Sequence, residues 1–198
     1  MKRLCLYLFV FIFTLSGCKT EDFQPADTAK FSPTQVVEEY FRRFDECEYT
    51  SQYYDMSDIL DDESTQAHNL IVYIRRIVKL HQLRNFKSVD NEDRCKVEFV
   101  FNEEQYNADG TVTVPVNITQ TTPSVVNGKI IATPGHIFLG NNRFFLKSVE
   151  GRWKIVGFEA DSALAGELEA VFSSTIRREY DEKEVIETYN KYFKNQTS

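Results

Sequence analysis

The chain has 198 residues, which is the length of one domain or of two small ones, and 42% of its residues are apolar, 14% aromatic and 27% charged. This composition is that of a folded globular protein and excludes a disordered or fibrous one. The formal net charge is −7, which argues against nucleic acid as a partner, and four cysteines are too few for a scaffold built on disulfides.

The N-terminus has the pattern of an export signal. Lys2 and Arg3 precede ten apolar residues, 4–13, and small residues follow at 16 and 17. This apolar run is too short to span a bilayer, which takes about 20 helical residues, so it predicts a signal peptide. Residues 15–18, Leu-Ser-Gly-Cys, resemble the lipobox of bacterial lipoproteins, which implies cleavage after residue 17 and lipidation of Cys18. The alternative is a plain signal peptide with a chance cysteine.

Residues 18–31 are predicted to be a flexible tether, because they contain Pro25 and no periodic apolar pattern. Residues 19–22, Lys-Thr-Glu-Asp, resemble the surface-export signal of Bacteroidetes lipoproteins, and an ordinary polar tether explains them equally well. Asp27-Thr28-Ala29 and Asp161-Ser162-Ala163 resemble the short O-glycosylation pattern of the same bacteria. These resemblances imply an outer-membrane lipoprotein of the bacterial cell envelope, held by its lipid and either facing the periplasm or exposed on the surface.

Helices are predicted from residue 32 onward. Ser32 and Gln35 form a capping box around Pro33, and the apolar residues that follow share one helical face. Residues 51–60 are predicted to form a second, short helix. A third helix follows the acidic turn 61–63, with Asp62 or Ser64 as its cap.

From about residue 84 the apolar period changes from 3.6 to 2, which predicts strands. The predicted strands are 95–101, 111–119, 129–133, 136–139, 143–149 and 152–158. Pro115 falls on the polar phase of its strand and predicts an edge position or a bulge. Glu150-Gly151 predicts a two-residue hairpin turn between the last two strands. Residues 163–195 return to a helical pattern.

This order of elements resembles the nuclear transport factor 2-like superfamily. The resemblance rests on the closing hairpin, 144–158, with its Gly-Arg-Trp-Lys-Ile pattern, and on the opening Ser-Pro-x-Gln-Val-Val-x-x-Tyr-Phe at 32–41. It covers residues 32–160 and implies an α+β fold, in which N-terminal helices pack on a curved antiparallel sheet. Residues 161–198 are then a C-terminal helical extension, after a signal peptide at 1–17. The short strand usual between the family's second and third helices is not evident.

The resemblance implies two kinds of function. Enzymes of the family, such as ketosteroid isomerase and scytalone dehydratase, hold a carboxylate or histidine in an apolar pocket, whereas many other members only bind ligands or partners. No carboxylate lies on the apolar phase of 111–119. We therefore expect a membrane-anchored binding or accessory module for a small apolar ligand, a glycan or a protein partner. A pocket enzyme of the isomerase, dehydratase or cyclase type is the alternative, and a purely structural envelope protein is a third possibility.

Aromatic side chains are the candidates for lining a pocket, and they can equally be plain core. They are Tyr40, Phe44, Tyr53, Tyr54, Phe99 and Trp153. No cofactor or metal is predicted, because the sequence has no Cys-x-x-Cys, no His-Glu-x-x-His and no glycine-rich phosphate loop. Cys47 and Cys95 either form a disulfide in an oxidising envelope or stay two separate buried thiols.

Overall fold

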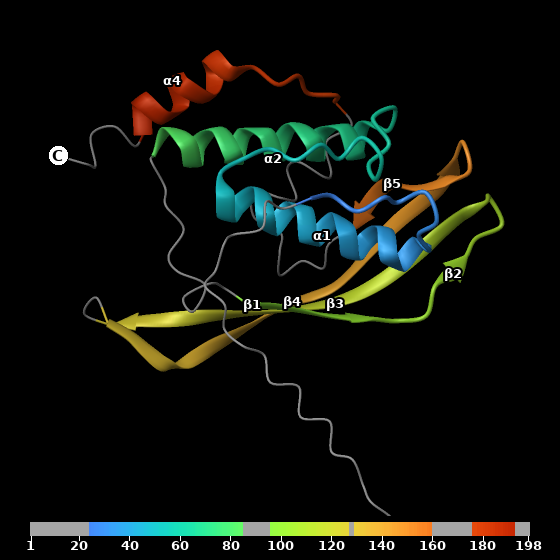
Figure 1. Ribbon diagram of the computed structural model, residues 1–198, viewed down its shortest axis with the longest axis horizontal. Coiled ribbons are helices and arrows are strands. Elements are labelled where there is room, and N and C mark those ends of the chain that lie inside the picture. The colour runs from blue at the N-terminus through green and yellow to red at the C-terminus, as the bar shows by residue number, and fades with distance from the viewer. Residues whose placement is uncertain (1–23, 85–95, 127–128, 160–175, 193–198) are drawn as a thin grey trace, which may run out of the picture.

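Helices lie on one side of a curved antiparallel sheet in the computed structural model, which describes residues 24–84, 96–126, 129–159 and 176–192 (Figure 1). The helices are α1 (Pro33–Thr50), α2 (Thr65–Leu83) and α4 (Glu182–Tyr192). The strands are β1 (Lys96–Phe101), β2 (Gln105–Tyr106), β3 (Thr111–Val126), β4 (Lys129–Val149) and β5 (Arg152–Glu159). The predicted α+β class, with helices on a curved antiparallel sheet and a C-terminal helix, is confirmed. None of the helices in these ranges has the length and apolar character needed to span a bilayer.

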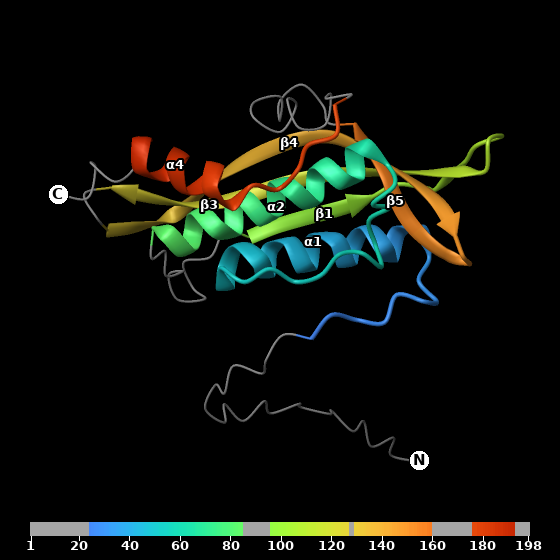
Figure 2. The same cartoon turned by 90° about the horizontal axis from the view of Figure 1, so that it is seen from above.

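The sheet has the strand order β1-β3-β4-β5, and β2 pairs with β3 beside β1. Seen from above, α1 and α2 lie side by side over this sheet, and α4 runs along α2 (Figure 2). The core lies between α1, α2 and the helix-facing side of the strands. Its fully buried aliphatic members include Val36 and Val37 of α1, Val114 and Val116 of β3, and Leu146 of β4.

β4 is longer than the sequence predicts. Its 21 residues join three predicted strands, and Pro134-Gly135 lies inside it instead of breaking it. Register shifts in the pairing of β3 with β4, one of them between Thr122 and Ser124, accommodate the irregularity. The prediction of separate strands at 129–133 and 136–139 was therefore wrong, because long-range pairing with β3 outweighs the local turn signal.

Pro115 lies in an interior strand, where it acts as an edge residue. β1 ends at Phe101, opposite Val116, and β2 begins at Gln105, opposite Thr113. Pro115 therefore faces the gap between the end of β1 and the start of β2. Its carbonyl accepts a hydrogen bond from Asn102 N–H at 3.0 Å in this gap, and a backbone N–H at 115 would point into the same gap. The missing donor therefore costs no ladder hydrogen bond with β4, where Pro115 pairs in register with Arg143.

Helix starts and the closing hairpin follow their local sequence signals. The capping box of Ser32 and Gln35 is formed at the start of α1. Ser64 is the N-cap residue of α2, but its hydroxyl donates to the Val156 carbonyl and so ties α2 to β5. Glu150 and Gly151 both have positive φ, 52° and 79°, as a two-residue turn of the predicted kind requires.

Residues 51–60 do not form the predicted short helix. Their backbone groups bind other parts of the chain: Ile59 C=O accepts from Ile155 N–H at 2.8 Å, and Asp61 N–H donates to the Ile155 carbonyl at 2.9 Å. Leu60 and Ile155 thus form an isolated parallel bridge. This bridge lies where the family resemblance leads one to expect a short strand, and β5 supplies the hydrogen bonds that a helix would have formed within itself.

Candidate functional site

An aromatic cluster fills the space between α1 and the sheet. Helical spacing turns Tyr40, Phe41 and Phe44 toward the strands, and the alternation of β1 turns Phe99 toward α1. Phe41 stacks on Phe99 with ring centroids 4.3 Å apart, and Tyr40 stacks on Phe44 at 6.2 Å. Phe144 of β4 contacts both Tyr40, at 5.7 Å, and Phe41, at 5.3 Å. The rings therefore form one continuous cluster.

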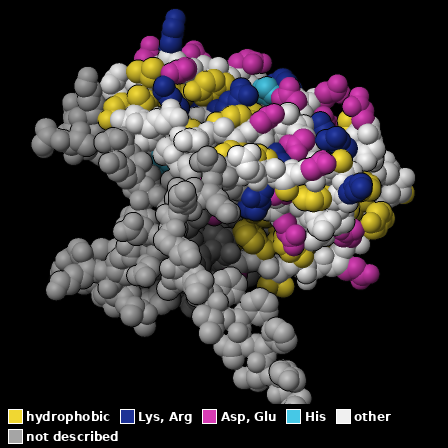
Figure 3. Space-filling model, in the orientation of Figure 1, with side chains coloured by type: hydrophobic (Ala, Val, Ile, Leu, Met, Phe, Trp, Pro, Cys, Tyr) yellow, Lys and Arg dark blue, Asp and Glu magenta, His cyan; other side chains and the backbone are white. Residues whose placement is uncertain are grey.

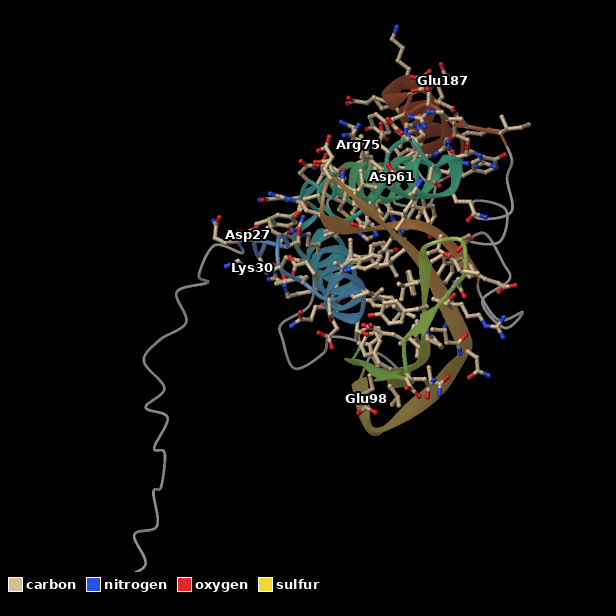
Figure 4. All side chains as sticks on the ribbon, turned by 90° about the vertical axis from the view of Figure 1, so that its right-hand side faces the viewer. Asp27, Lys30, Asp61, Arg75, Glu98 and Glu187 are labelled. Carbon is tan, nitrogen blue, oxygen red and sulfur yellow. The ribbon has the colours of Figure 1, made fainter. Side chains whose placement is uncertain are left out.

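Four rings of this cluster remain partly exposed. Phe41 and Phe44 of α1 and Phe99 and Phe101 of β1 are half-buried, whereas Tyr40 and Phe144 are buried. β1 is an edge strand of the sheet, so these four phenylalanines follow the line where α1 meets the sheet edge. We call Phe41, Phe44, Phe99 and Phe101 the aromatic rim. Figure 4 shows the side chains that pack between α1 and the strands.

The structure brings three of the predicted pocket residues, Tyr40, Phe44 and Phe99, into this cluster. Tyr53 and Tyr54, from the segment after α1, and Trp153, from β5, pack against the same core as half-buried side chains. The Arg75 guanidinium lies 4.8 Å from the centre of the Tyr53 ring.

Sequence reasoning did not select several rings of this cluster, namely Phe41, Phe101, Phe144 and Phe158. Periodicity identifies the first three: Phe41 lies on the apolar face of α1, and Phe101 and Phe144 lie on the apolar phase of their strands. Phe158 falls off the alternation of Trp153 and Ile155, because the pairing of β4 with β5 shifts register between Phe145 and Leu146. The predicted pocket therefore selects part of a larger aromatic surface.

The buried polar chemistry on this side of the sheet is sparse. The buried, helix-facing side chains of β3, β4 and β5 in the described residues are aliphatic or aromatic, apart from the amide of Asn142. Glu98 of β1 is exposed and lies at the edge of the sheet remote from the helices (Figure 4). His68 and His81 belong to α2, and the side chain of His136 lies outside the described residues. These buried positions thus offer no Asp, Glu or His as a general acid or base.

A buried ionic cluster borders the buried face of α1, on the side turned away from Phe41 and Phe44, and sequence reasoning missed it. Arg43 is 1% exposed and donates to Glu39, at 2.7 Å, and to both carboxylate oxygens of Asp58, at 2.5 and 2.9 Å. It also donates to the backbone carbonyls of Asp55, at 2.7 Å, and Ala26, at 3.1 Å. These contacts use all five N–H groups of the guanidinium.

The carboxylates of this cluster are held in their charged forms. Burial by itself raises the pKa of Glu39, but hydrogen bonds from Arg42 and Arg43 outweigh it and lower that pKa below its ordinary value. Burial also raises the pKa of Asp58, but hydrogen bonds from Arg43 and Thr28 outweigh the effect of burial and lower that pKa below its ordinary value. The cluster is therefore fully ionised at neutral pH.

The cluster also fixes residues 24–31, which the sequence predicts as part of a tether. Ala26 N–H donates to Glu39 at 3.1 Å, and Arg42 donates to the Gln24 carbonyl at 3.3 Å. The Thr28 hydroxyl donates to Asp58 at 3.0 Å, and Thr28 is 2% exposed. This segment is packed against α1, and the buried Thr28 hydroxyl does not suit the O-glycosylation that its sequence pattern resembles. The second such pattern, Asp161-Ser162-Ala163, lies outside the described residues.

A second set of polar contacts holds the C-terminal segment on α2. The Asn69 side chain is buried, and it donates to the Ile176 carbonyl at 3.0 Å and accepts from Arg178 N–H at 2.8 Å. The His68 ring lies between Asp62, with Nδ1 2.6 Å from the carboxylate, and the Arg178 carbonyl, 2.7 Å from Nε2. Both partners are acceptors, so a doubly protonated His68 satisfies both contacts and a neutral ring satisfies only one.

Exposed ion pairs extend this contact along α4. Lys79 pairs with Glu182 at 2.5 Å, and Arg76 pairs with Glu184 at 3.0 Å. Figure 3 shows basic and acidic side chains interspersed over this face of the molecule. The C-terminal helix is therefore attached to α2 mainly by surface charges.

Of the three cysteines with a predicted role, the structure describes Cys47. Cys47 is fully buried, and its sulfur accepts a hydrogen bond from Tyr54 N–H at 3.4 Å. Cys95, its predicted disulfide partner, and Cys18, the predicted lipidation site, both lie outside the described residues. The pairing and the lipidation stay predictions.

No protein-family model and no curated protein matches the chain. Among solved structures, it is similar to the phospholipid-binding protein of Ralstonia solanacearum in complex with a phospholipid, with 10% identity over 83% of this chain and 84% of that chain. The TM-score is 0.27, so this likeness supports no statement about function. The α+β fold itself is compatible with a nuclear transport factor 2-like architecture. That statement rests on the helices and the antiparallel sheet described above.

Proposed function

We propose that this protein is a lipoprotein of the bacterial cell envelope, anchored through Cys18, whose α+β domain binds a small apolar ligand at the aromatic rim. The sequence of residues 1–18 supports the anchor. The observation that carries the binding role is the rim: four half-buried phenylalanine rings that continue into the buried cluster around Tyr40 and Phe144. Covering such rings with an apolar ligand is favourable by about 25 cal/mol for each Å² removed from water.

The chemistry of the rim favours an apolar ligand over a glycan. Phenylalanine offers apolar ring faces and carries no hydrogen-bonding group, whereas sugar hydroxyls need polar partners when they leave water. Among the described helix-facing positions of β3, β4 and β5, the one buried polar side chain is the amide of Asn142. A pocket enzyme of the isomerase, dehydratase or cyclase type would need a carboxylate or histidine there, and no observation favours that alternative.

Binding is tested with a fluorescent apolar probe and two matched variants. A Cys18→Ser chain, which takes no lipid, is titrated with anilinonaphthalene sulfonate, and Phe101→Ala is compared with Val100→Ala. Val100 is the neighbour of Phe101 on β1 and is 60% exposed, away from the cluster. We expect Phe101→Ala to weaken binding several-fold and Val100→Ala to leave it unchanged. Equal binding by both variants, with melting curves that show both folded, contradicts binding at the rim.

The anchor is tested separately by metabolic labelling with an alkyne-bearing fatty acid. We expect the wild-type chain to carry the label and to fractionate with membranes, and Cys18→Ser to carry none. A label that persists in Cys18→Ser, or an unlabelled wild-type chain, contradicts lipidation at Cys18.

A further inference from the structure

The ionic cluster and the aromatic side chains of α1 project from different sides of that helix. Successive residues of an α-helix are 100° apart, so Phe41 projects about 160° around the helix from both Glu39 and Arg43, and Phe44 about 100° from Arg43. Residues 24–31 are bound to the Glu39 and Arg43 side. Figure 4 agrees, because Asp27 and Lys30 lie on the side of α1 that is remote from the sheet.

The binding of residues 24–31 limits how far the body of the protein can lie from a lipid on Cys18. Six residue steps separate Cys18 from Gln24, and each step spans at most about 3.6 Å, so the reach is about 20 Å. The chain is fixed from Gln24 onward by Arg42, and more firmly at Ala26 and Thr28 by the buried cluster. The free length between lipid and body is therefore much shorter than the predicted tether of 18–31 suggests.

That reach is too short for the anchor to pass around the domain. A compact domain of about 130 residues has a radius of gyration of about 14 Å and is therefore about 35 Å across. Half its circumference exceeds the reach of about 20 Å by a wide margin. Presenting the opposite side of the domain to the bilayer would require the segment 24–31 to detach, and Arg43, Glu39 and Asp58 would then lose the Ala26 carbonyl, the Ala26 N–H and the Thr28 hydroxyl.

We propose that the side of α1 that carries residues 24–31 faces the anchoring membrane. The occupant of this side is a phospholipid bilayer surface, held close by the short reach from Cys18. This orientation rests on the proposed anchoring through Cys18.

The test measures which side of the domain lies near the bilayer. The chain from Cys18 onward, with Cys95→Ser so that the buried Cys47 is its one other thiol, is coupled through Cys18 to a maleimide-headgroup lipid in phosphatidylcholine vesicles that also carry a lipid-bound energy-transfer acceptor. A donor dye is attached through an azide-bearing residue at Lys30, beside the ionic cluster, or at Glu98, on the remote edge of the sheet (Figure 4). Both residues are exposed, so both variants are expected to fold.

We expect transfer from position 30 to exceed transfer from position 98 several-fold. Insertion of twelve Gly-Ser residues between Asp22 and Phe23 lengthens the reach without touching the body, and should bring the two values close together. Equal transfer from both positions with the native length, or stronger transfer from position 98, overturns the orientation. Because the lipid is attached chemically, this result does not depend on whether cells lipidate Cys18, which the labelling experiment decides.

Discussion

The two ends of the described chain are both held against helices, but by interactions of different strength. Residues 24–31 are held by a buried ionic cluster, in which Arg43 is 1% and Glu39 4% exposed. The C-terminal segment 176–192 is held by ion pairs whose carboxylates, on Glu182 and Glu184, are more than half exposed. Exposed pairs contribute little because water screens them, whereas removing one partner of a buried pair leaves an uncompensated charge.

Apolar burial sharpens the contrast at the C-terminal end. Val185 is the buried residue of α4, while Ile176 and Tyr192 are 73% and 55% exposed. Val185 and Val72 of α2 are both buried, and neither belongs to the main core. A helix that contributes one buried side chain gains little from the hydrophobic effect. The N-terminal end is therefore built to stay in place, and the C-terminal end can detach while the core remains folded.

The largest expected effect comes from breaking the N-terminal cluster. Arg43→Met removes the buried partner of both Glu39 and Asp58 and leaves Glu39 only the exposed Arg42, so we expect the free energy of unfolding to fall by about 3–5 kcal/mol. Urea denaturation measures this loss. Arg42→Met is the matched control, because Arg42 also binds Glu39 but its side chain is 43% exposed, and it should cost at most about 1 kcal/mol. Equal losses in the two variants would show that burial is not what distinguishes them.

The next effect comes from removing the buried clamp at the C-terminal end. Asn69→Leu removes both hydrogen bonds to the backbone of Ile176 and Arg178, and an unsatisfied group costs about 1–3 kcal/mol. We expect amide hydrogen exchange to accelerate throughout 176–192, while exchange in residues 24–31 stays as in the wild type. Unchanged protection of 176–192 would mean that α4 is held without this clamp.

Local sequence signals predicted the parts of the fold that depend on near neighbours. The capping box of α1 and the Glu150-Gly151 turn are set by residues within four positions of one another, and both form as predicted. The break at Pro134-Gly135 and the helix at 51–60 were wrong, because pairing with β3 and β5 outweighs the local preference there.

The site shows the same division. Periodicity predicted that Tyr40, Phe44 and Phe99 share a surface. It did not predict the ionic cluster, because charges on a helix ordinarily indicate a solvated face and Asp58 is distant from Arg43 in the sequence. One signal was present: Arg43 follows Val36 and Tyr40, and precedes Cys47, at the spacing of the buried face of α1. No local sequence pattern predicts that residues 24–31 bind to that face, because the binding depends on Glu39 of α1 and on Asp58, which the fold brings close to residues 24–31.

Carboxylates at both ends of the described chain have lowered pKa values, so both sets of contacts are formed at neutral pH. The lowered pKa values of Glu39 and Asp58 stabilise the N-terminal cluster above about pH 4, where the unfolded carboxylates are ionised, and this stability is lost only as the pH falls through the native values. At the C-terminal end, the hydrogen bond from His68 lowers the pKa of Asp62, so its carboxylate stays an acceptor at neutral pH. Arg177 also faces that carboxylate, at 3.3 Å.

The smallest expected effect is that of salt. Raising the ionic strength from 0.1 to 1 M shortens the screening length from about 10 to about 3 Å, which weakens the exposed pairs of Lys79 and Arg76 with α4 and leaves the buried pair of Arg43 and Glu39 nearly unaffected. Exchange in 182–192 should therefore rise modestly with salt, with no change in 24–31. The double variant Glu182→Gln, Glu184→Gln removes both pairs, so its α4 should exchange faster at low salt and respond less to added salt. If the double variant responded to salt as the wild type does, the attachment of α4 would rest on Val185 and the Asn69 clamp alone, and surface charge would have no part in it.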